Sequence, residues 1–363
     1  MIGRIREALA FRKCVLALAM LVWASPAAPA TTKLTIIAGI PPTALSVKVT
    51  KEFFIPEINK RLAASGVDFK IEWTEAWSGT VAKLPEVFST VSEGVAHVGV
   101  QVWAFEGSKL PLESITFNVP FGISDEVALT QVMRNLHAAI PEMNEQFARN
   151  NHEHLVSWAT DPDQLISKFA VTRLESLKGH KIGASGTQAQ YFRNTGAVAV
   201  SSGMDQAMEA MRSGLYEGYP APVSLMIPYN MHESGSHLTK VKFGATISSG
   251  LSMNKKAFDA LPAHAKKIFK EVAWEAGLLH AKTARERSIA FEQVIKKKGL
   301  VVAELPAEER KRWANAMPNV AREWAQRTDA RGLPGTRLVK AYMDELRKVP
   351  GADKEIARHW DRE

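Results

Sequence analysis

Short apolar segments alternate with longer stretches of helical periodicity along most of the chain, and this alternation restricts the fold more than any other feature. Such an order is typical of α/β folds in which the sheets are mainly parallel. Between the first two segments, apolar residues recur at near-helical spacing, and Pro56 is expected to kink that helix. We expect strands at residues 33–40, 68–75, 95–102, 155–159, 181–184, 197–200, 246–254 and 300–303.

The amino terminus has the pattern of a cleaved secretory signal. Four basic residues from Arg4 to Lys13 precede an apolar run at 15–23 and the A-x-A ending Ala28-Pro29-Ala30. The apolar run is much shorter than the roughly 20 residues that a helix needs to cross a bilayer. We therefore expect residues 1–30 to be a signal peptide that is removed on export, and the mature protein to be soluble in the periplasm.

Cysteine is almost absent. The one cysteine, Cys14, lies inside the predicted signal and follows Phe11-Arg12-Lys13 rather than the small and apolar residues of a lipoprotein signal. A mature chain without cysteine has no disulfide, no thiol chemistry and no cysteine-bound metal. Its stability is expected to depend on the burial of a large core.

The length predicts two lobes. About 333 residues would remain after cleavage, which is more than one core usually spans. No polar linker divides the chain, so we expect interleaved lobes: residues 31–155 with about 247–285, and residues 156–246 with about 286–363. A helix-forming run from Ala263 to about Lys297 is long enough to pack on both.

The charge and the motifs point away from nucleic acids, cofactors and catalysis. The net charge is +8, or +5 without the signal, and no basic stripe with interleaved aromatic residues appears, so we expect no nucleic-acid partner. The stretch 183–187 lacks the final glycine of a nucleophile elbow, and no glycine-rich phosphate loop is present. We expect neither an enzyme nor a bound cofactor or metal.

Two further patterns have simple structural interpretations. His152-Glu153-His154 would place both imidazoles on one side of a strand, but it follows Asn150-Asn151 in a polar stretch, and we interpret it as a solvated loop. Trp313, Met317, Val320 and Trp324 have the spacing of one buried helical face, which we interpret as core.

Seven segments stand in a recognisable order and spacing: Gly94–Val100, Asn118–Phe121, Leu174–Ile182 with its L-K-G-x-K-I pattern, Gly196–Val200, Met204–Gly218, Pro222 and Leu251–Pro262. Together they resemble the DctP-like receptors of tripartite ATP-independent periplasmic (TRAP) transporters. The resemblance implies two α/β lobes, joined by crossing strands and a long shared helix, that close on a ligand at the hinge. It also implies a monomeric receptor that delivers a small organic molecule to a small and a large membrane subunit.

The chain departs from this family at two expected ligand anchors. In most members the strand continues K-I-R, and the resemblance implies that this arginine pairs with a ligand carboxylate, for which its planar fork is suited. Here that position is Gly183, and Ala221 replaces the asparagine of the family's D-G-x-x-N-P turn. A glycine and an alanine leave space rather than form bonds. The ligand is therefore expected to be bulkier than a C4-dicarboxylate or to be held by other groups, and an organic acid stays possible.

Other candidate contacts follow from position. Asp161 and Asp163 leave a strand where the cleft would begin, although Asp-Pro-Asp is equally typical of a solvated turn. Aromatic residues near strand ends could stack on a planar ligand, and most of the nine tryptophans are expected to be core. For each side chain, core or surface is an open alternative. The predicted set is Trp77, Gln101, Trp103, Asp161, Asp163, Gly183, Ser185, Met204, Tyr219 and Ala221.

Three functions stay open at this point: a TRAP receptor, a binding protein that serves a sensor kinase or an ATP-driven importer, and a periplasmic enzyme on a similar fold. The resemblance favours the first.

Overall fold

The computed structural model describes residues 30–362; the predicted signal, apart from Ala30, lies outside them. The described chain forms two sheets, of five and six strands. In the first sheet, in the order β2-β1-β3-β10-β4, β1 runs parallel to β2 and β3, whereas β10 runs antiparallel to both β3 and β4. Its strands are β1 (Ala30–Ala38), β2 (Phe69–Ala76), β3 (Val98–Val102), β4 (His152–Thr160) and β10 (Thr246–Asn254).

The second sheet has the order β11-β9-β5-β8-β6-β7, with β6 parallel to β7 and β8, and β5 antiparallel to β8 and β9. Its strands are β5 (Asp163–Ser167), β6 (Lys181–Ala184), β7 (Val198–Ser201), β8 (Gly218–Pro222), β9 (His237–Lys240) and β11 (Val301–Glu304). The two sheets together contain all eight predicted strands. The sequence did not predict β5, β8 and β9, because β5 follows Pro162 directly, β8 contains two prolines, and β9 is short and polar.

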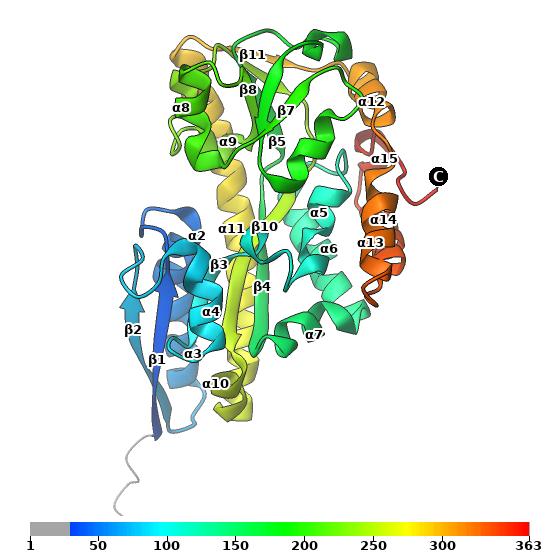
Figure 1. The fold of residues 1–363 in the computed structure, drawn as a ribbon. Helices are drawn as coiled ribbons and strands as arrows, with labels where there is room; N and C mark the ends of the chain where they lie inside the picture. The colour runs from blue at the N-terminus through cyan, green and yellow to red at the C-terminus, as the bar shows by residue number, and fades with distance from the viewer. Residues whose placement is uncertain (1–29, 363) are drawn as a thin grey trace, which may run out of the picture.

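Two short backbone segments cross from one sheet to the other (Figure 1). Asp161-Pro162 joins β4 to β5, and residues 241–245 join β9 to β10. The helix α11 (Ala263–Lys297) runs the length of both lobes and packs on β4 as well as on α9 (Val223–Met226). The predicted α/β fold with interleaved lobes, a crossing strand at Thr246–Asn254 and a long shared helix is thus confirmed. The predicted residue boundaries of the lobes stay a proposal.

Near the amino terminus, α2 (Leu45–Val49) and α3 (Ile55–Ala64) pack on α11 and are joined by a π-helical turn, Thr50–Phe54. Pro56 lies in the first turn of α3, where its missing N–H needs no helical partner. The irregularity predicted at Pro56 therefore takes the form of the π turn that precedes it. The first sheet is also covered by α4 (Val87–Ser92), α6 (Glu126–Ala139) and α7 (Pro141–Arg149). Among residues 30–362, no helix combines the length and apolarity needed to span a membrane.

The interpretation of His152-Glu153-His154 as a solvated loop was wrong. These residues begin β4, and His152 is fully buried. Its Nδ1 lies 2.7 Å from Ser252 Oγ, its Nε2 lies 3.1 Å from Phe88 O, and burial lowers its pKa to about 4. The polar residues Asn150-Asn151 form the turn, with Asn151 in the left-handed conformation that asparagine tolerates. The strand begins immediately after them.

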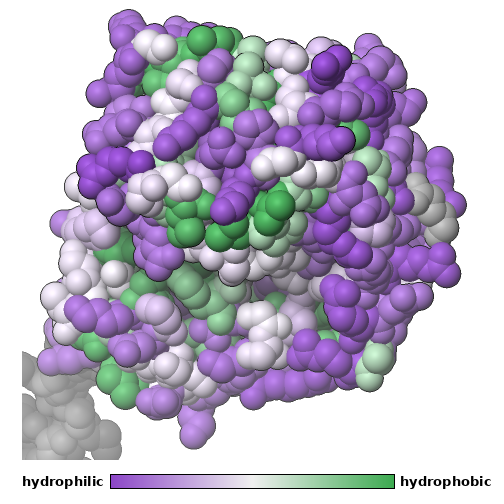
Figure 2. Space-filling model, turned by 45° about the horizontal axis from the view of Figure 1, so that its top comes forward, coloured by the Kyte–Doolittle hydropathy of each residue, from purple (hydrophilic) through white to green (hydrophobic). Residues whose placement is uncertain are grey.

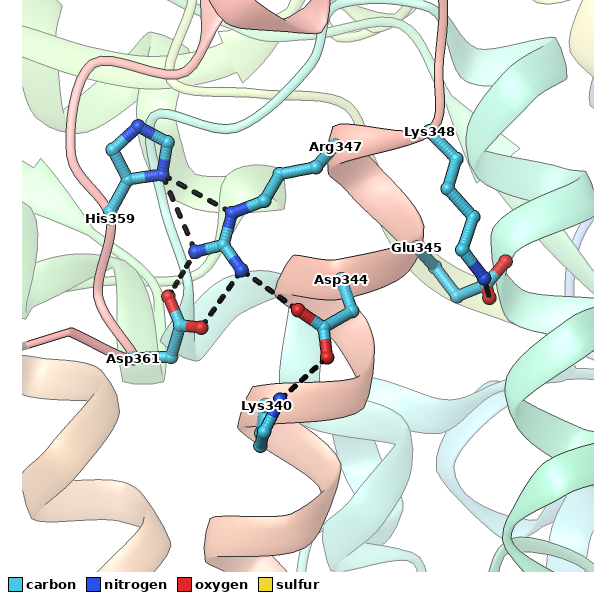
Figure 3. A network of polar contacts seen from close by, with 7 residues as sticks. All are labelled: Lys340, Asp344, Glu345, Arg347, Lys348, His359 and Asp361. Atoms are coloured by element: carbon cyan, nitrogen blue, oxygen red, sulfur yellow. Dashed lines mark hydrogen bonds and ion pairs between the residues drawn. The ribbon is translucent and has the colours of Figure 1, made fainter.

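The last four helices lie along one side of the molecule (Figure 1): α12 (Ala307–Ala316), α13 (Val320–Asp329), α14 (Gly335–Arg347) and α15 (Ala352–Glu355). The four residues from Trp313 to Trp324 are buried core, as expected. They belong to two helices rather than one face, because Pro318 separates α12 from α13. Figure 3 shows how Arg347 fastens the chain end to α14: its Nη1 lies 2.9 Å from both Asp344 Oδ1 and Asp361 Oδ2.

Arg310 of α12 holds one of the two crossings. Its guanidinium is buried and donates to backbone carbonyls only: Val241 O at 3.1 Å, Lys242 O at 2.7 Å and Gly122 O at 3.2 Å, with a further bond to Glu355 O. Burial lowers its pKa to about 10. One side chain thus joins the crossing at Val241-Lys242, the segment after α5 (Ile115–Asn118) and the carboxyl-terminal segment.

We expect Arg310→Met to lower the free energy of unfolding by about 3 kcal/mol or more, because several buried carbonyls lose their donor at once. Urea unfolding followed by circular dichroism measures this change. Arg322→Met is the matched control, because Arg322 is exposed, and a surface substitution typically changes stability by no more than about 0.5 kcal/mol. Equal stability of the two variants would contradict the role of Arg310.

Candidate ligand-binding cleft

The carboxyl ends of the parallel strands in both sheets point to the crossings. In the first sheet, β3 and β4 run in the same direction because both are antiparallel to β10, so β1, β2 and β3 end on the side where β4 leaves the sheet. In the second, Asp163 at the start of β5 pairs with Pro222 at the end of β8, so β6, β7 and β8 end there too. This is the crevice where open α/β sheets bind ligands. Figure 2 shows a hollow between the lobes in which apolar residues gather.

Trp77 stands at the end of β2 on the first lobe. Its ring is half-buried, and its Nε1 donates to Glu75 Oε2 at 3.0 Å. The next two amides, of Ser78 and Gly79, donate to Ile40 O and Ala38 O at the end of β1, each at 3.0 Å. The prediction that Trp77 lies at the edge of the cleft agrees with this position.

The sequence analysis did not name Lys83, which lies beside the turn of Trp77, or Phe105, which follows the strand β3. Lys83 approaches the same turn, since a Cβ on Gly79 would lie 3.6 Å from its Nζ. Phe105, which follows β3, is 53% exposed. Positive charge and apolar surface are therefore both present on this wall. The sequence does not indicate the positive charge of Lys83 at this wall, because only the folded loop brings Lys83 back to Gly79.

Gln101 and Trp103 are core residues, and we remove them from the proposed contacts. Gln101 is 1% exposed, and its Oε1 accepts a hydrogen bond from Ser252 Oγ at 2.8 Å. Trp103 is buried against Phe147, with ring centroids 5.1 Å apart. Gln101 is interior because β3 is a central strand, and Trp103, in the 3-10 turn that follows β3, is buried.

Two tyrosines of the second lobe, Tyr216 and Tyr219, are fully buried in its core, so Tyr219 is not a direct ligand contact, whereas a third, Tyr229, is partly exposed. Tyr219 in β8 donates its hydroxyl to Ser202 O at 3.0 Å, and the Tyr216 hydroxyl lies 3.0 Å from Ser202 Oγ. Burial raises the pKa of both phenols, so they are neutral hydrogen-bonding groups. Tyr229, after α9, is 38% exposed, and its pKa is raised by burial and by Asp205. Sequence reasoning named Tyr219 but missed Tyr216, Tyr229 and Asp205.

The space expected at Gly183 is not open. A Cβ on Gly183 would lie 2.6 Å from Tyr216 Cε1, so the ring of Tyr216 covers this position. Ala221 is likewise fully buried and pairs with Gln164 in the sheet. The prediction that Gly183 and Ala221 leave space for the ligand was therefore wrong. The ring of Tyr216, from the loop before β8, fills the space at Gly183, and Ala221 is buried in the sheet. Met204, which follows β7, is half-buried against Tyr216 and Tyr219, and its contact with a ligand stays a prediction.

Asp161 and Asp163 are not in a solvated turn. Both are almost completely buried. Asp161 accepts hydrogen bonds from the hydroxyl and the amide of Ser224, the latter at 3.2 Å. Asp163 Oδ2 accepts from Gln188 Nε2 at 2.6 Å, and Gln188 Oε1 accepts from Ser185 Oγ at 2.5 Å. The two acids, with Ser185, fasten the Asp161-Pro162 crossing to the second lobe.

Burial raises the pKa of Asp161 to about 6 and that of Asp163 to about 7, and no cation opposes the shift of Asp163. An unfolded aspartate titrates near 3.9. The stabilising contribution of the protonated acids is therefore complete below about pH 4 and is lost as the pH rises to about 7.

We expect Asp163→Asn to flatten this part of the stability profile, since asparagine keeps an acceptor for Gln188 but cannot ionise. The wild-type protein should lose up to a few kcal/mol between about pH 5 and pH 8, and the variant should lose less. Urea unfolding at both pH values measures the difference. Asp68→Asn, at an exposed position, is the control. An unchanged profile in Asp163→Asn would contradict the assignment.

Comparison with known proteins agrees with this geometry. A family model described as bacterial extracellular solute-binding protein, family 7 (DctP) matches residues 60–328. A solute-binding protein of Sulfitobacter sp. (strain NAS-14.1) is 26% identical over 143 residues, which cover 39% of this chain and 43% of that protein. The C4-dicarboxylate-binding periplasmic protein DctP of Rhodobacter capsulatus is 26% identical over 147 residues, or 40% and 44%. The chain aligns with less than half the length of either relative.

Solved structures share the fold. A TRAP periplasmic solute-binding protein of Desulfovibrio salexigens has a TM-score of 0.77 at 19% identity, with 88% of this chain and 97% of that chain covered. A marine metagenome TRAP protein in complex with metahydroxyphenylacetate has a TM-score of 0.72 at 19% identity, covering 88% and 99%. A Rhodoferax ferrireducens TRAP protein with copurified benzoate has a TM-score of 0.74 at 16% identity, covering 87% and 98%. Since the family model matches most of its length, the chain belongs to the DctP family, family 7 of the bacterial extracellular solute-binding proteins.

Proposed function

We propose that the chain is a periplasmic receptor that captures a small organic ligand between its lobes and delivers it to the small and large membrane subunits of a TRAP transporter. The observation that carries the proposal is the hinge. The strand ends of two sheets face a common crevice, and only two short crossings and one helix join the sheets. This geometry suits closure by hinge motion around a ligand. Family membership supports delivery to TRAP subunits over a sensor kinase or an ATP-driven importer.

The wall of the cleft supports a ligand with a planar or apolar body. Tyr216 covers the position where the family resemblance places a carboxylate-binding arginine. The exposed parts of Phe105 and Tyr229, with Trp77, offer aromatic surface instead. Related folds have been solved with metahydroxyphenylacetate and with benzoate. Lys83 is the cation that we propose for an acidic ligand group, so an organic acid with a ring is the ligand class that fits best.

The other parts of the proposal come from the sequence. Removal of residues 1–30 by signal cleavage would release a mature protein that begins at Thr31 in the periplasm. We propose a monomer, because one chain supplies both walls of the cleft. Family membership supports a receptor role rather than catalysis.

We expect calorimetry of the mature protein to detect tight binding of an aromatic or other bulky organic acid, and binding of succinate or malate at least about a hundredfold weaker. Trp77→Ala should weaken the preferred ligand about tenfold or more, since an aromatic wall is lost. Small-angle scattering should show a smaller radius of gyration with ligand. Micromolar binding of succinate would overturn the ligand class, and an unchanged radius at saturation would overturn hinge closure.

A double-mutant cycle tests whether Tyr216 excludes a side chain from position 183. Gly183→Arg alone should destabilise the protein, because its Cβ would meet the tyrosine ring. Combined with Tyr216→Ala, the same arginine should cost clearly less, with a coupling of about 1 kcal/mol or more, and succinate affinity should rise. Tyr216→Ala alone is the control for lost packing. Additive effects on stability would show that the ring does not occupy the space of an arginine.

A further inference from the structure

A second pocket of about 270 Å³ lies on the first lobe, away from the crevice between the lobes. It is bounded by α6, α7, α11 and the outer edge of β4, which is an edge strand of its sheet. The residues of β4 that line it, 154–157, come before the end of the strand at Thr160, where the cleft begins. The pocket is therefore a separate site. Its volume exceeds the roughly 150 Å³ of a cavity that holds benzene.

The lining of this pocket carries positive charge and no carboxylate. Of its twelve lining residues, Arg134 and Lys270 are cations, and His137 and His154 are imidazoles. Lys270 is held by Glu153, with Nζ and Oε1 2.6 Å apart, and donates to His154 O. Arg134 is different: its guanidinium lies 4.3 Å from the centroid of the Trp274 ring. Within residues 30–362, no carboxylate lies at ion-pairing distance from it. Its planar fork is thus oriented by the indole but lacks an anion.

The two imidazoles are held in fixed positions. Their rings stack with centroids 3.9 Å apart and planes within 2° of parallel. Asn144 donates its amide to His137 O, so its Oδ1 accepts from His137 Nδ1 at 3.0 Å. Ser157 donates to Glu113 Oε2 at 3.1 Å, so its oxygen accepts from His154 Nε2 at 2.8 Å. Burial lowers the pKa of His154 well below its usual value, so this ring stays neutral.

The buried carboxylate of Glu113 lies beside this pair of imidazoles. Its Oε1 lies 3.0 Å from His137 Nε2, although that nitrogen has no well-aligned hydrogen bond among the described residues. Gln146 also approaches Oε1, at 3.3 Å, and is itself held by the Leu112 amide. Such a supporting layer fixes ring orientation and limits the conformational entropy lost on binding. The walls are apolar where Met133, Leu155, Val156 and Trp274 contribute.

We propose that this pocket binds a small aromatic carboxylate, with the carboxylate on the free fork of Arg134 and the ring between Trp274 and the apolar wall. Bidentate pairing suits a carboxylate, because the guanidinium presents two parallel N–H groups. The indole keeps the guanidinium in place through a cation–π contact. The inference does not depend on which ligand the cleft takes, since no residue is shared between the two sites.

Fluorine NMR of the mature chain labelled with 5-fluorotryptophan tests this proposal, with benzoate as the probe. The Trp274 signal is identified by its absence in Trp274→Phe, and the Trp77 signal by its absence in Trp77→Ala. We expect a saturable shift of the Trp274 signal at millimolar benzoate or below. Arg134→Gln should weaken this response about tenfold or more, because a charged hydrogen-bond pair is lost. Arg322→Gln, at an exposed position far along the chain, removes the same charge and should change nothing.

The two sites give separate results. A benzoate response at Trp77 alone would place the probe in the cleft and overturn the second site, while leaving the proposed receptor function intact. No shift of the Trp274 signal up to about 10 mM benzoate, or an equal response in Arg134→Gln and the wild type, would also overturn it. A response at Trp274 that persists in Trp77→Ala and is lost in Arg134→Gln would confirm it, whatever the cleft binds.

Discussion

The backbone crosses between the sheets twice, and its polar groups at the crossings must find partners outside any strand ladder. Side chains supply them. Arg310 donates to the carbonyls of Val241 and Lys242, and Gln164 Oε1 accepts from the amide of Lys242 at 2.8 Å. Direct backbone bonds add Phe243 N to Asp163 O and Ala245 N to Ile123 O. Because both crossings are short and carry buried polar contacts, these contacts help to fix the relation between the lobes.

This arrangement also explains the distribution of aromatic residues. Trp158, Trp313 and Trp360 are buried and fill the layers between the sheets and their helices. Trp313 donates to Tyr191 O at 2.7 Å, and Trp360 donates to Pro120 O at 2.7 Å. A buried indole usually has such a partner for its N–H, but the N–H of Trp158 has none among the described residues. Of the aromatic side chains that remain partly exposed, Trp77 follows the end of β2, Phe105 follows β3, and Tyr229 follows α9.

Selectivity in the cleft is expected to arise from packing as much as from charge. Tyr216 lies over Gly183 and directs its hydroxyl to Ser202, so the same residue removes space for a cation and adds a neutral hydrogen-bonding group. Such a site discriminates by shape and by the cost of leaving its polar groups unpaired, in addition to the charge proposed for Lys83. In the second pocket the guanidinium of Arg134 is oriented by Trp274 beside an apolar wall.

The sequence by itself determined the α/β class, the interleaved lobes, the crossing strand at Thr246–Asn254 and the long helix α11, because these depend on local periodicity and on the absence of a linker. It also placed Trp77 just after the end of a strand, β2. It failed for β8, where two prolines obscure a strand, and for Asp161 and Asp163, which appear as a turn but are buried. Only the tertiary structure decided that Tyr216 covers Gly183 and that Gln101 and Trp103 are core. A side chain's neighbours across the fold are fixed by packing between distant segments, which periodicity does not encode.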